Sequence, residues 1–161
     1  MTDALNPEPL LRALHQAGVQ HIIIGGFAVN AHGVIRPSRD LDIVPDPDPA
    51  NLERLAMLLA DLEARHVGLG DFHADEFPLD PRDPKDIRSG ANFRLETRLG
   101  DLDIMQWVPG IEADSAFGAL VSESIEGELD GTPLRVCGLA DLIRAAGRPR
   151  DLDDLKRLGV D

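Results

Sequence analysis

The chain has 161 residues, of which 43% are hydrophobic and only 4% aromatic, so we expect one globular domain over residues 1–161 with a core of Leu, Ile, Val and Ala. The formal net charge of −13 argues against non-specific binding to nucleic acid, although it leaves room for a local basic patch. The single cysteine, Cys137, rules out an internal disulfide, and no apolar run is long enough for a membrane helix or a signal peptide, so we expect a cytoplasmic protein with no membrane partner.

The first half of the chain predicts three helices and two strands. Leucines at helical spacing follow Pro7 and end at Gly18, and a second leucine pattern begins after the prolines that follow Asp46. Between them lie a β-branched run and a segment in which charged and apolar residues alternate, which are both typical of strands. In chain order, the helices are expected at 7–18, 27–33 and 50–66, and the strands at 21–26 and 39–45.

The second half predicts an irregular segment, a hairpin and further short elements. Residues 67–90 are rich in Asp, Pro and Gly and have no clear period. Residues 91–108 read as a hairpin that turns at Leu99-Gly100. A helix is expected at 112–125, a last strand at 131–139, and short C-terminal helices at about 139–158. These elements together predict the α/β (α+β) class, with a small mixed β-sheet flanked by helices.

Two aspartates lie two residues apart inside the apolar segment 39–45. Residues at this spacing in a strand point to the same face, so Asp40 and Asp42 project side by side while Leu41 and Ile43 enter the core. Two such close carboxylates repel each other, and a divalent cation would remove that conflict. Hard oxygen ligands on a rigid strand favour Mg²⁺.

The same pattern recurs downstream at Asp101 and Asp103. Asp103 lies between apolar residues, so it is expected in a buried strand, whereas Asp101 lies beside Gly100 in the expected turn. If the two strands are neighbours, Asp40, Asp42 and Asp103 converge, and three carboxylates can hold two metal ions for attack on a phosphate. The alternative is that these aspartates cap turns or face water on an edge strand.

Gly25 and Gly26 lie between the first expected strand and a helix. This geometry directs free backbone N–H groups toward one point, and glycine lets a phosphate come close to the backbone. A Gly-Gly pair alone is weak evidence, but the Asp40/Asp42 pair follows on the next strand. The glycines are therefore expected to hold a triphosphate and the aspartates to hold the bridging metal.

The order of these motifs resembles the DNA polymerase β-like nucleotidyltransferase superfamily. The form seen here, Gly25-Gly26-Phe27-Ala28-Val29, then His32-Gly33, Arg36, Ser38, Asp40 and Asp42, is similar to the branch of AbiEii-type toxins from bacterial toxin–antitoxin systems and their uncharacterised bacterial relatives. The C-terminal stretch ADLIRAAGRPRDLDDLKRL also resembles the ending of that branch.

The resemblance implies Mg²⁺-dependent transfer of a nucleoside monophosphate from a nucleoside triphosphate to an acceptor hydroxyl on tRNA or protein, with a cognate antitoxin as a partner. It implies that Asp40 and Asp42 bind the metals and that Asp103 is the third carboxylate, able to act as base. The residues it implies for nucleotide binding are Gly25, Gly26, Arg36 and Ser38, with Arg144 or Arg148 in place of a lysine found in relatives.

Two other functions remain open at this point. Small antibiotic nucleotidyltransferases share the glycine pair and the paired aspartates, but usually have tryptophan after the glycines, where this chain has Phe27. The segment between Ile143 and Gly147 is about three residues shorter than in the resembling branch, which favours a degenerate member that binds a nucleotide or a partner without catalysis. Intact Asp40, Asp42 and Asp103 argue against that reading.

Overall fold

The computed structural model describes residues 6–32, 38–67, 78–111, 115–138 and 140–141. Five helices lie in these ranges: α1 Glu8–Gln16, α2 Gly25–Ala31, α3 Pro49–Asp61, α4 Pro84–Ile87 and α5 Ala116–Val121. Seven strands accompany them: β1 His21–Ile24, β2 Asp40–Pro45, β3 Arg65–His66, β4 Phe93–Thr97, β5 Gly100–Ile104, β6 Ile125–Leu129 and β7 Thr132–Val136. None of these helices is long and apolar enough to cross a membrane.

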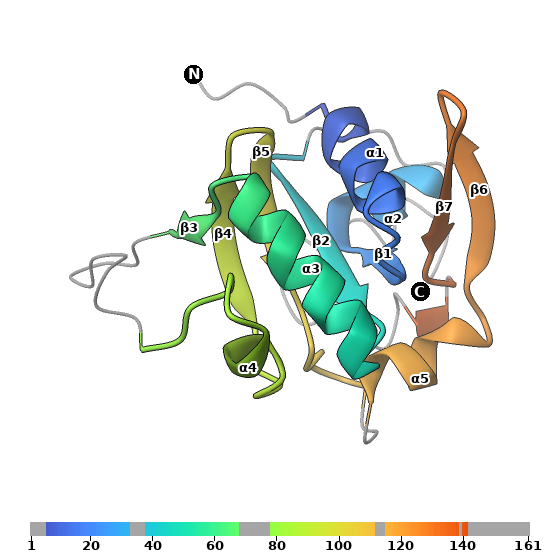
Figure 1. The fold of residues 1–161 in the computed structure, drawn as a ribbon. Helices are drawn as coiled ribbons and strands as arrows, with labels where there is room; N and C mark the ends of the chain where they lie inside the picture. The colour runs from blue at the N-terminus through green and yellow to red at the C-terminus, as the bar shows by residue number, and fades with distance from the viewer. Residues whose placement is uncertain (1–5, 33–37, 68–77, 112–114, 139, 142–161) are drawn as a thin grey trace.

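The strands form one mixed sheet in the order β3-β4-β5-β2-β1-β7-β6 (Figure 1). The pairs β2/β5 and β1/β7 are parallel, and the other four pairs are antiparallel. A mixed sheet with flanking helices is the predicted α/β class. The pairing of β2 with β5 matters most for function, because it brings the two aspartate-bearing segments together.

Helices α1 and α3 lie side by side over one face of the sheet (Figure 1). The leucines of both helices are buried as the helical spacing predicted, among them Leu10, Leu14, Leu55 and Leu59, each 0% exposed. The strands present alternate residues to this layer, including Leu41 and Ile43 of β2, which are also fully buried. This packing fixes which face of β2 the intervening aspartates occupy.

Buried Asn51 in α3 holds the ends of β1 and β2 remote from the aspartates. Its amide nitrogen donates to the carbonyls of Gln20 and Asp46 at 2.9 and 2.8 Å, and its Oδ1 accepts from the Gln20 N–H at 2.7 Å. The side chain is 0% exposed, so each of these bonds replaces one to water. Asn51 thus fixes α3 against both strands.

The third helix is shorter than the sequence predicted. It ends at Asp61 rather than continuing to residue 66, because Glu63 adopts a left-handed conformation with φ of 54° and the chain then forms β3. A left-handed residue ends a helix, and glycine usually takes that position. Because Glu63 takes it here, the sequence does not mark where the helix ends. The helix expected at 27–33 instead begins at Gly25 and ends at Ala31.

The helix expected at 112–125 is also wrong at its C-terminal end. Helix α5 ends at Val121, and Ile125 opens strand β6, which pairs with β7. Asp130 and Gly131 join these strands with φ of 48° and 83°, as in a two-residue hairpin of the Asp-Gly kind. The sequence therefore contained a hairpin signal that the helix prediction overlooked.

The hairpin expected at 91–108 is confirmed as β4 and β5, and Thr97 pairs with Gly100 across the turn. Asp101 was predicted in that turn, but it lies within β5. The segment expected to be irregular contains the short helix α4, which begins at the capping residue Asp83. The C-terminal helices expected at about 139–158 lie almost entirely outside the described residues.

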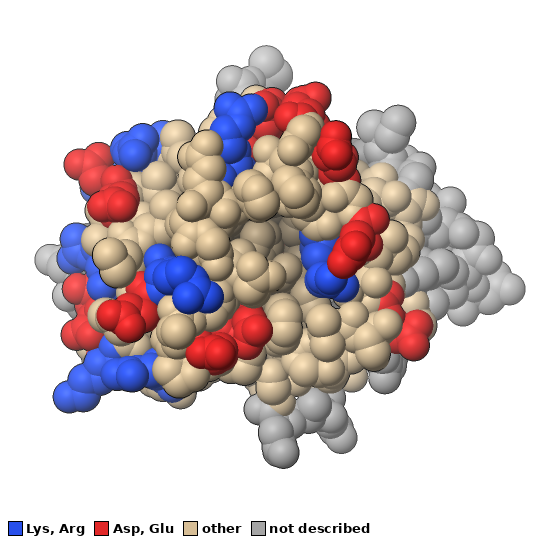
Figure 2. Space-filling model, turned by 45° about the vertical axis from the view of Figure 1, so that its right-hand side comes forward, with Lys and Arg blue, Asp and Glu red and all other residues tan. Residues whose placement is uncertain are grey.

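Charged side chains of both signs are interspersed on the face shown in Figure 2, with uncharged surface between them. On this face the net charge of −13 is not gathered into one acidic patch.

Candidate active site

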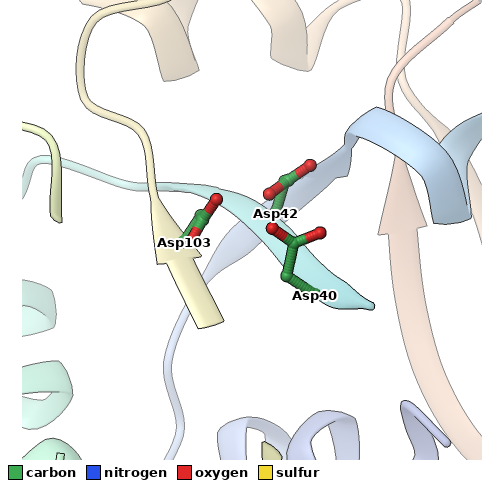
Figure 3. Close-up of side chains that lie close together, drawn as sticks. All are labelled: Asp40, Asp42 and Asp103. Carbon is green, nitrogen blue, oxygen red and sulfur yellow. The ribbon is translucent and has the colours of Figure 1, made fainter. Parts of the chain in front are cut away.

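Three carboxylates converge where β2 and β5 run side by side. The parallel register sets Asp42 opposite Asp103 and Asp40 opposite Asp101. Asp40, Asp42 and Asp103 each offer an oxygen that lies within 4.8 Å of the others. Figure 3 shows the three side chains pointing toward one another from the two strands. The convergence predicted from the sequence is confirmed.

The alternation of the two strands produces this arrangement. Leu41 and Ile43 of β2, and Leu102 and Ile104 of β5, are each 0% exposed. Because successive residues of a strand face opposite ways, burying these four side chains places the aspartates between them on the other face. A register shift of one residue would send the carboxylates into the core, so the hydrophobic pattern fixes the site.

The environment of Asp103 strongly perturbs its carboxyl group. Burial raises its pKa from 3.8 to about 8, and the neighbouring charges of Asp42 and Asp40 act in the same direction. When protonated, Asp103 can share its proton with these two neighbours. When ionised, its buried Oδ1 has no hydrogen-bond donor among the described residues. The guanidinium of Arg94, whose Nε lies 3.9 Å from Oδ2, partly compensates an ionised Asp103, and Oδ1 still lacks a donor among the described residues.

The cluster fits a divalent cation. It supplies three oxygen ligands on two paired strands, and one oxygen is buried and unsatisfied. A bound cation would offset both the burial and the mutual repulsion that raise the pKa of Asp103. Carboxylate oxygens on a rigid frame suit Mg²⁺ in particular. The three aspartates can therefore bind a divalent metal.

Gly25 has a steric role at this site that the sequence did not reveal. It begins α2 with φ of 71°, in the left-handed region that favours glycine. A Cβ atom at this position would lie 2.0 Å from Oδ2 of Asp42. Glycine is therefore required here so that the Asp42 carboxylate can occupy its place in the cluster. Its expected contact with phosphate stays a prediction.

Arg94 and Asp101 also border the cluster. Arg94 of β4 lies opposite Asp103 in the sheet, and its Nε is 3.9 Å from Asp103 Oδ2. Asp101 is largely exposed, and its pKa is raised by partial loss of solvent and by the charges of Glu96 and Asp40. The sequence analysis did not identify Arg94, which lies nine residues before Asp103 on the predicted hairpin. Once the hairpin register is known, the pairing of Arg94 with Asp103 follows.

The other residues predicted to bind nucleotide are placed as follows. Ser38 precedes β2 and is buried, with 4% exposure. Gly26, expected to hold a triphosphate, is buried in the first turn of α2. Arg36, Arg144 and Arg148 lie outside the described residues. His32, which ends α2, contacts the Cys137 carbonyl through Nε2 at 2.9 Å, so it ties this helix to the end of β7.

No protein-family model matches this chain, and no curated protein matches it significantly. The structure is similar to the lincomycin-bound crystal structure of the lincosamide antibiotic adenylyltransferase LnuA, with a TM-score of 0.61 over 98% of each chain. The two sequences are 16% identical, so the similarity concerns the fold. The narrower resemblance to AbiEii-type toxins stays a prediction. The chain has the fold of a nucleotidyltransferase.

Proposed function

We propose that this protein is a Mg²⁺-dependent nucleotidyltransferase that moves a nucleoside monophosphate from a nucleoside triphosphate to an acceptor hydroxyl. The observation that carries the proposal is the meeting of Asp40, Asp42 and Asp103 within 4.8 Å on two paired strands. The shared fold with an adenylyltransferase supports it. A crowded set of carboxylates destabilises the metal-free protein, so its presence is more easily explained by a function than by stability.

In this proposal, the triphosphate binds at the start of α2 and beside the residues that precede β2. Gly25 and Gly26 would offer backbone N–H groups to the phosphates, and Gly25 lies against Asp42, so phosphate and metal ligands are neighbours. Ser38 lies two residues before Asp40 in the sequence. Arg36, Arg144 and Arg148 complete the proposed nucleotide-binding set, and the arginines would contact phosphate oxygens.

The chemistry assigned to Asp103 is proton acceptance. Bound Mg²⁺ supplies charge stabilisation to the phosphates during an in-line displacement. Asp103 takes the proton of the acceptor hydroxyl, whose oxygen forms a bond to the α-phosphorus while the bond to pyrophosphate breaks. Asp40 and Asp42 would hold the metal.

The acceptor we propose is a hydroxyl on tRNA or protein, and the biological role is that of a toxin paired with an antitoxin protein. This part rests on the sequence resemblance of the glycine and aspartate motifs. A second candidate is modification of an antibiotic, which the structural similarity to a lincosamide adenylyltransferase favours. Phe27 after the glycines, where such enzymes usually carry tryptophan, speaks against it.

The experiment that tests the proposal pairs two assays on wild type and on Asp103→Ala. Label transfer is measured from each of the four triphosphates with Mg²⁺ to total bacterial RNA, to protein and to lincosamide or aminoglycoside antibiotics. Triphosphate binding is measured by the shift in melting temperature. The wild type should do both, whereas Asp103→Ala should bind but not transfer. Wild-type binding with no transfer to any acceptor would instead support a degenerate nucleotide-binding protein.

A further inference from the structure

We propose that Trp107 binds the acceptor by stacking on an unpaired nucleobase, so that the acceptor hydroxyl belongs to the end of a single-stranded RNA rather than to a protein. The inference rests on the proposed nucleotidyl transfer and names the residue that would select its acceptor. Trp107 is the single tryptophan of the chain, and its side chain is 64% exposed although it lies only four residues after Asp103. Single exposed apolar side chains are ordinary on protein surfaces, but the backbone of this one is held rigidly and lies on the face of the carboxylate cluster.

The backbone around Trp107 is held by two side-chain amides. Asn92 Oδ1 accepts from the N–H groups of Gln106 and Trp107 at 2.7 and 2.9 Å, and Asn92 Nδ2 donates to the Trp107 carbonyl at 2.9 Å. Gln106 Nε2 in turn donates to the carbonyls of Ile87 and Ala91 at 2.9 and 2.8 Å. These bonds fix the position from which the indole projects, so a ligand that stacks on it meets a surface that is already in place.

Trp107 follows Asp103 on the same face of the sheet. The burial alternation of β5 continues past its last residue, with Leu102, Ile104 and Val108 buried and with Asp103, Met105 and Trp107 more exposed. The Met105 N–H still bonds to the Ile43 carbonyl at 2.8 Å, so the chain stays extended beside β2 up to this residue. Gln106 points to the helix side, because its amide reaches the Ile87 carbonyl of α4, which packs beside α3. Asp103, Met105 and Trp107 therefore form one line that faces away from α3.

This line places Trp107 and the glycine pair at opposite ends of the cluster. Strand β1 runs antiparallel to β2 with Ile24 opposite Asp42, so Gly25 continues toward the start of β2. Strand β5 runs parallel to β2 with Asp103 opposite Asp42, so Trp107 lies toward the end of β2. In an in-line displacement the acceptor attacks from the side opposite the leaving pyrophosphate. With the phosphates held by the glycines, as proposed above, the acceptor therefore arrives from the side of Trp107.

A nucleobase is the group that an exposed indole can bind at this distance from the cluster. Four residues of extended chain separate the Cα atoms of Trp107 and Asp103 by about 13 Å. A single-stranded RNA end covers this distance with a base on the indole and its terminal hydroxyl at the carboxylate. Stacking on an aromatic side chain tolerates any base and contributes roughly 5- to 150-fold in affinity per base. A serine or threonine hydroxyl of a protein has no such ring beside it.

Arg94 adds a local positive charge on the same face. It pairs with Asp103 across β4 and β5, its Nε is 3.9 Å from the Asp103 carboxylate, and its side chain is 57% exposed. An RNA that lies along the line from Trp107 to Asp103 passes this guanidinium, which can attract a backbone phosphate. The attraction offsets part of the repulsion expected from the net charge of −13. Stacking, which needs no charge, remains the contact that distinguishes RNA from a protein acceptor.

The test uses the fluorescence of Trp107, because the chain has one tryptophan and no tyrosine. The protein is titrated in Mg²⁺ and the α,β-methylene analogue of whichever triphosphate the wild type binds best, so that the donor site is filled. The probes are a short single-stranded RNA, the same RNA with an abasic 3′-terminal residue, and a serine-containing peptide. RNA binding is also measured by the polarisation of a dye on the 5′ end, for wild type, Trp107→Phe, Trp107→Leu and the control Met57→Leu. Met57 is a matched control, because it is 63% exposed and lies on α3, on the other side of the sheet.

The intact RNA should quench the Trp107 fluorescence and bind more tightly than the abasic RNA, whereas the triphosphate analogue alone should leave the fluorescence unchanged. Trp107→Leu should bind the RNA about tenfold more weakly than the wild type, and Trp107→Phe should recover part of the loss because it keeps a ring. Met57→Leu should bind as the wild type does. All four proteins should bind the triphosphate equally, since Trp107 is assigned to the acceptor and not to the donor.

RNA that binds without quenching, or that binds wild type and Trp107→Leu equally, would overturn the inference. Quenching by the triphosphate analogue alone would also overturn it, because Trp107 would then contact the base of the donor. Absence of RNA binding, with or without binding of the peptide, would do the same. None of these results touches the proposed function, because triphosphate binding by the same samples reports on that independently. If the wild type binds no triphosphate, the proposed function fails, and the RNA titration with Mg²⁺ alone still decides whether Trp107 stacks on a base.

Discussion

Replacing Asp103 by asparagine should stabilise the metal-free protein, and the gain should grow with pH. The pKa of Asp103 is raised to about 8 in the folded chain, whereas an unfolded aspartate has a pKa near 3.8. Between about pH 4 and pH 8 the folded state therefore holds a proton that the unfolded state has lost. The free energy of unfolding must fall as pH rises through that window and level off above it. Asparagine resembles the protonated carboxyl and does not titrate.

The size of the effect follows from the shift. Each pH unit within the window corresponds to about 1.36 kcal/mol, so the interval from pH 5 to pH 8 could contribute about 4 kcal/mol in full. Solvent reaches the edge of the cluster, and relaxation of the site screens the charges, so we expect roughly half of that, about 2 kcal/mol. On a domain of this size, about 2 kcal/mol corresponds to a shift of roughly 4–8 °C in melting temperature.

The assay is urea unfolding of wild type and Asp103→Asn in EDTA at pH 5 and pH 8. Other titrating groups are common to both proteins, so the difference between the two free energies isolates Asp103. The advantage of the variant should be about 2 kcal/mol larger at pH 8 than at pH 5. A constant difference, or one that shrinks as pH rises, would refute the reasoning that burial and the neighbouring carboxylates raise the pKa of Asp103.

Three further predictions concern the glycine, the metal ligand and the buried amide. Gly25→Ala should cost more stability than Gly131→Ala, because both have left-handed φ but only the first would place a Cβ against Asp42; equal losses in urea unfolding would remove the steric argument. Asp42→Asn should lose most of the melting-temperature shift given by Mg²⁺ with a triphosphate, and an unchanged shift would count against its assignment as a ligand. Asn51→Ala should lower the free energy of unfolding by about 2–3 kcal/mol, since it leaves the Gln20 and Asp46 backbone groups without their partner; a loss below about 1 kcal/mol would contradict this.

The convergence of the three aspartates could be predicted from sequence because it needs only the alternation of a strand. Leu41 and Leu102 are buried, so their neighbours in each strand face the other way. Once the two strands pair, their aspartates lie on the same face and next to each other. What alternation cannot supply is the identity of the adjacent strand. The neighbours β2 and β5 are separated along the chain by α3, β3, α4 and β4, and their pairing is a property of the sheet order.

The contacts that sequence reasoning missed depend on that tertiary placement. The glycine pair was interpreted through phosphate binding, whereas the need for glycine at position 25 comes from the Asp42 side chain on another strand. The pairing of Arg94 with Asp103 depends on the hairpin register. If the register were wrong by one residue, the side chain paired with Asp103 would point to the opposite face of the sheet. Glu63 ends α3 in a left-handed conformation, which a glutamate in the sequence does not predict.

The repulsion within the cluster leads to a last prediction, in which Mg²⁺ alone offsets the stability that the protein loses as pH rises. Without metal, the wild type should be weakest near pH 8, where Asp103 must ionise among Asp40 and Asp42. Metal binds ionised carboxylates, so its affinity rises over the same window in which the metal-free protein weakens. Millimolar Mg²⁺ without any nucleotide should therefore raise the melting temperature more at pH 8 than at pH 5, and it should affect Asp103→Asn less than wild type at pH 8. Arg98→Gln, which keeps all three carboxylates, should respond as the wild type does. An equal rise at both pH values would mean that Mg²⁺ binds elsewhere, and the cluster would then have to be explained without a metal.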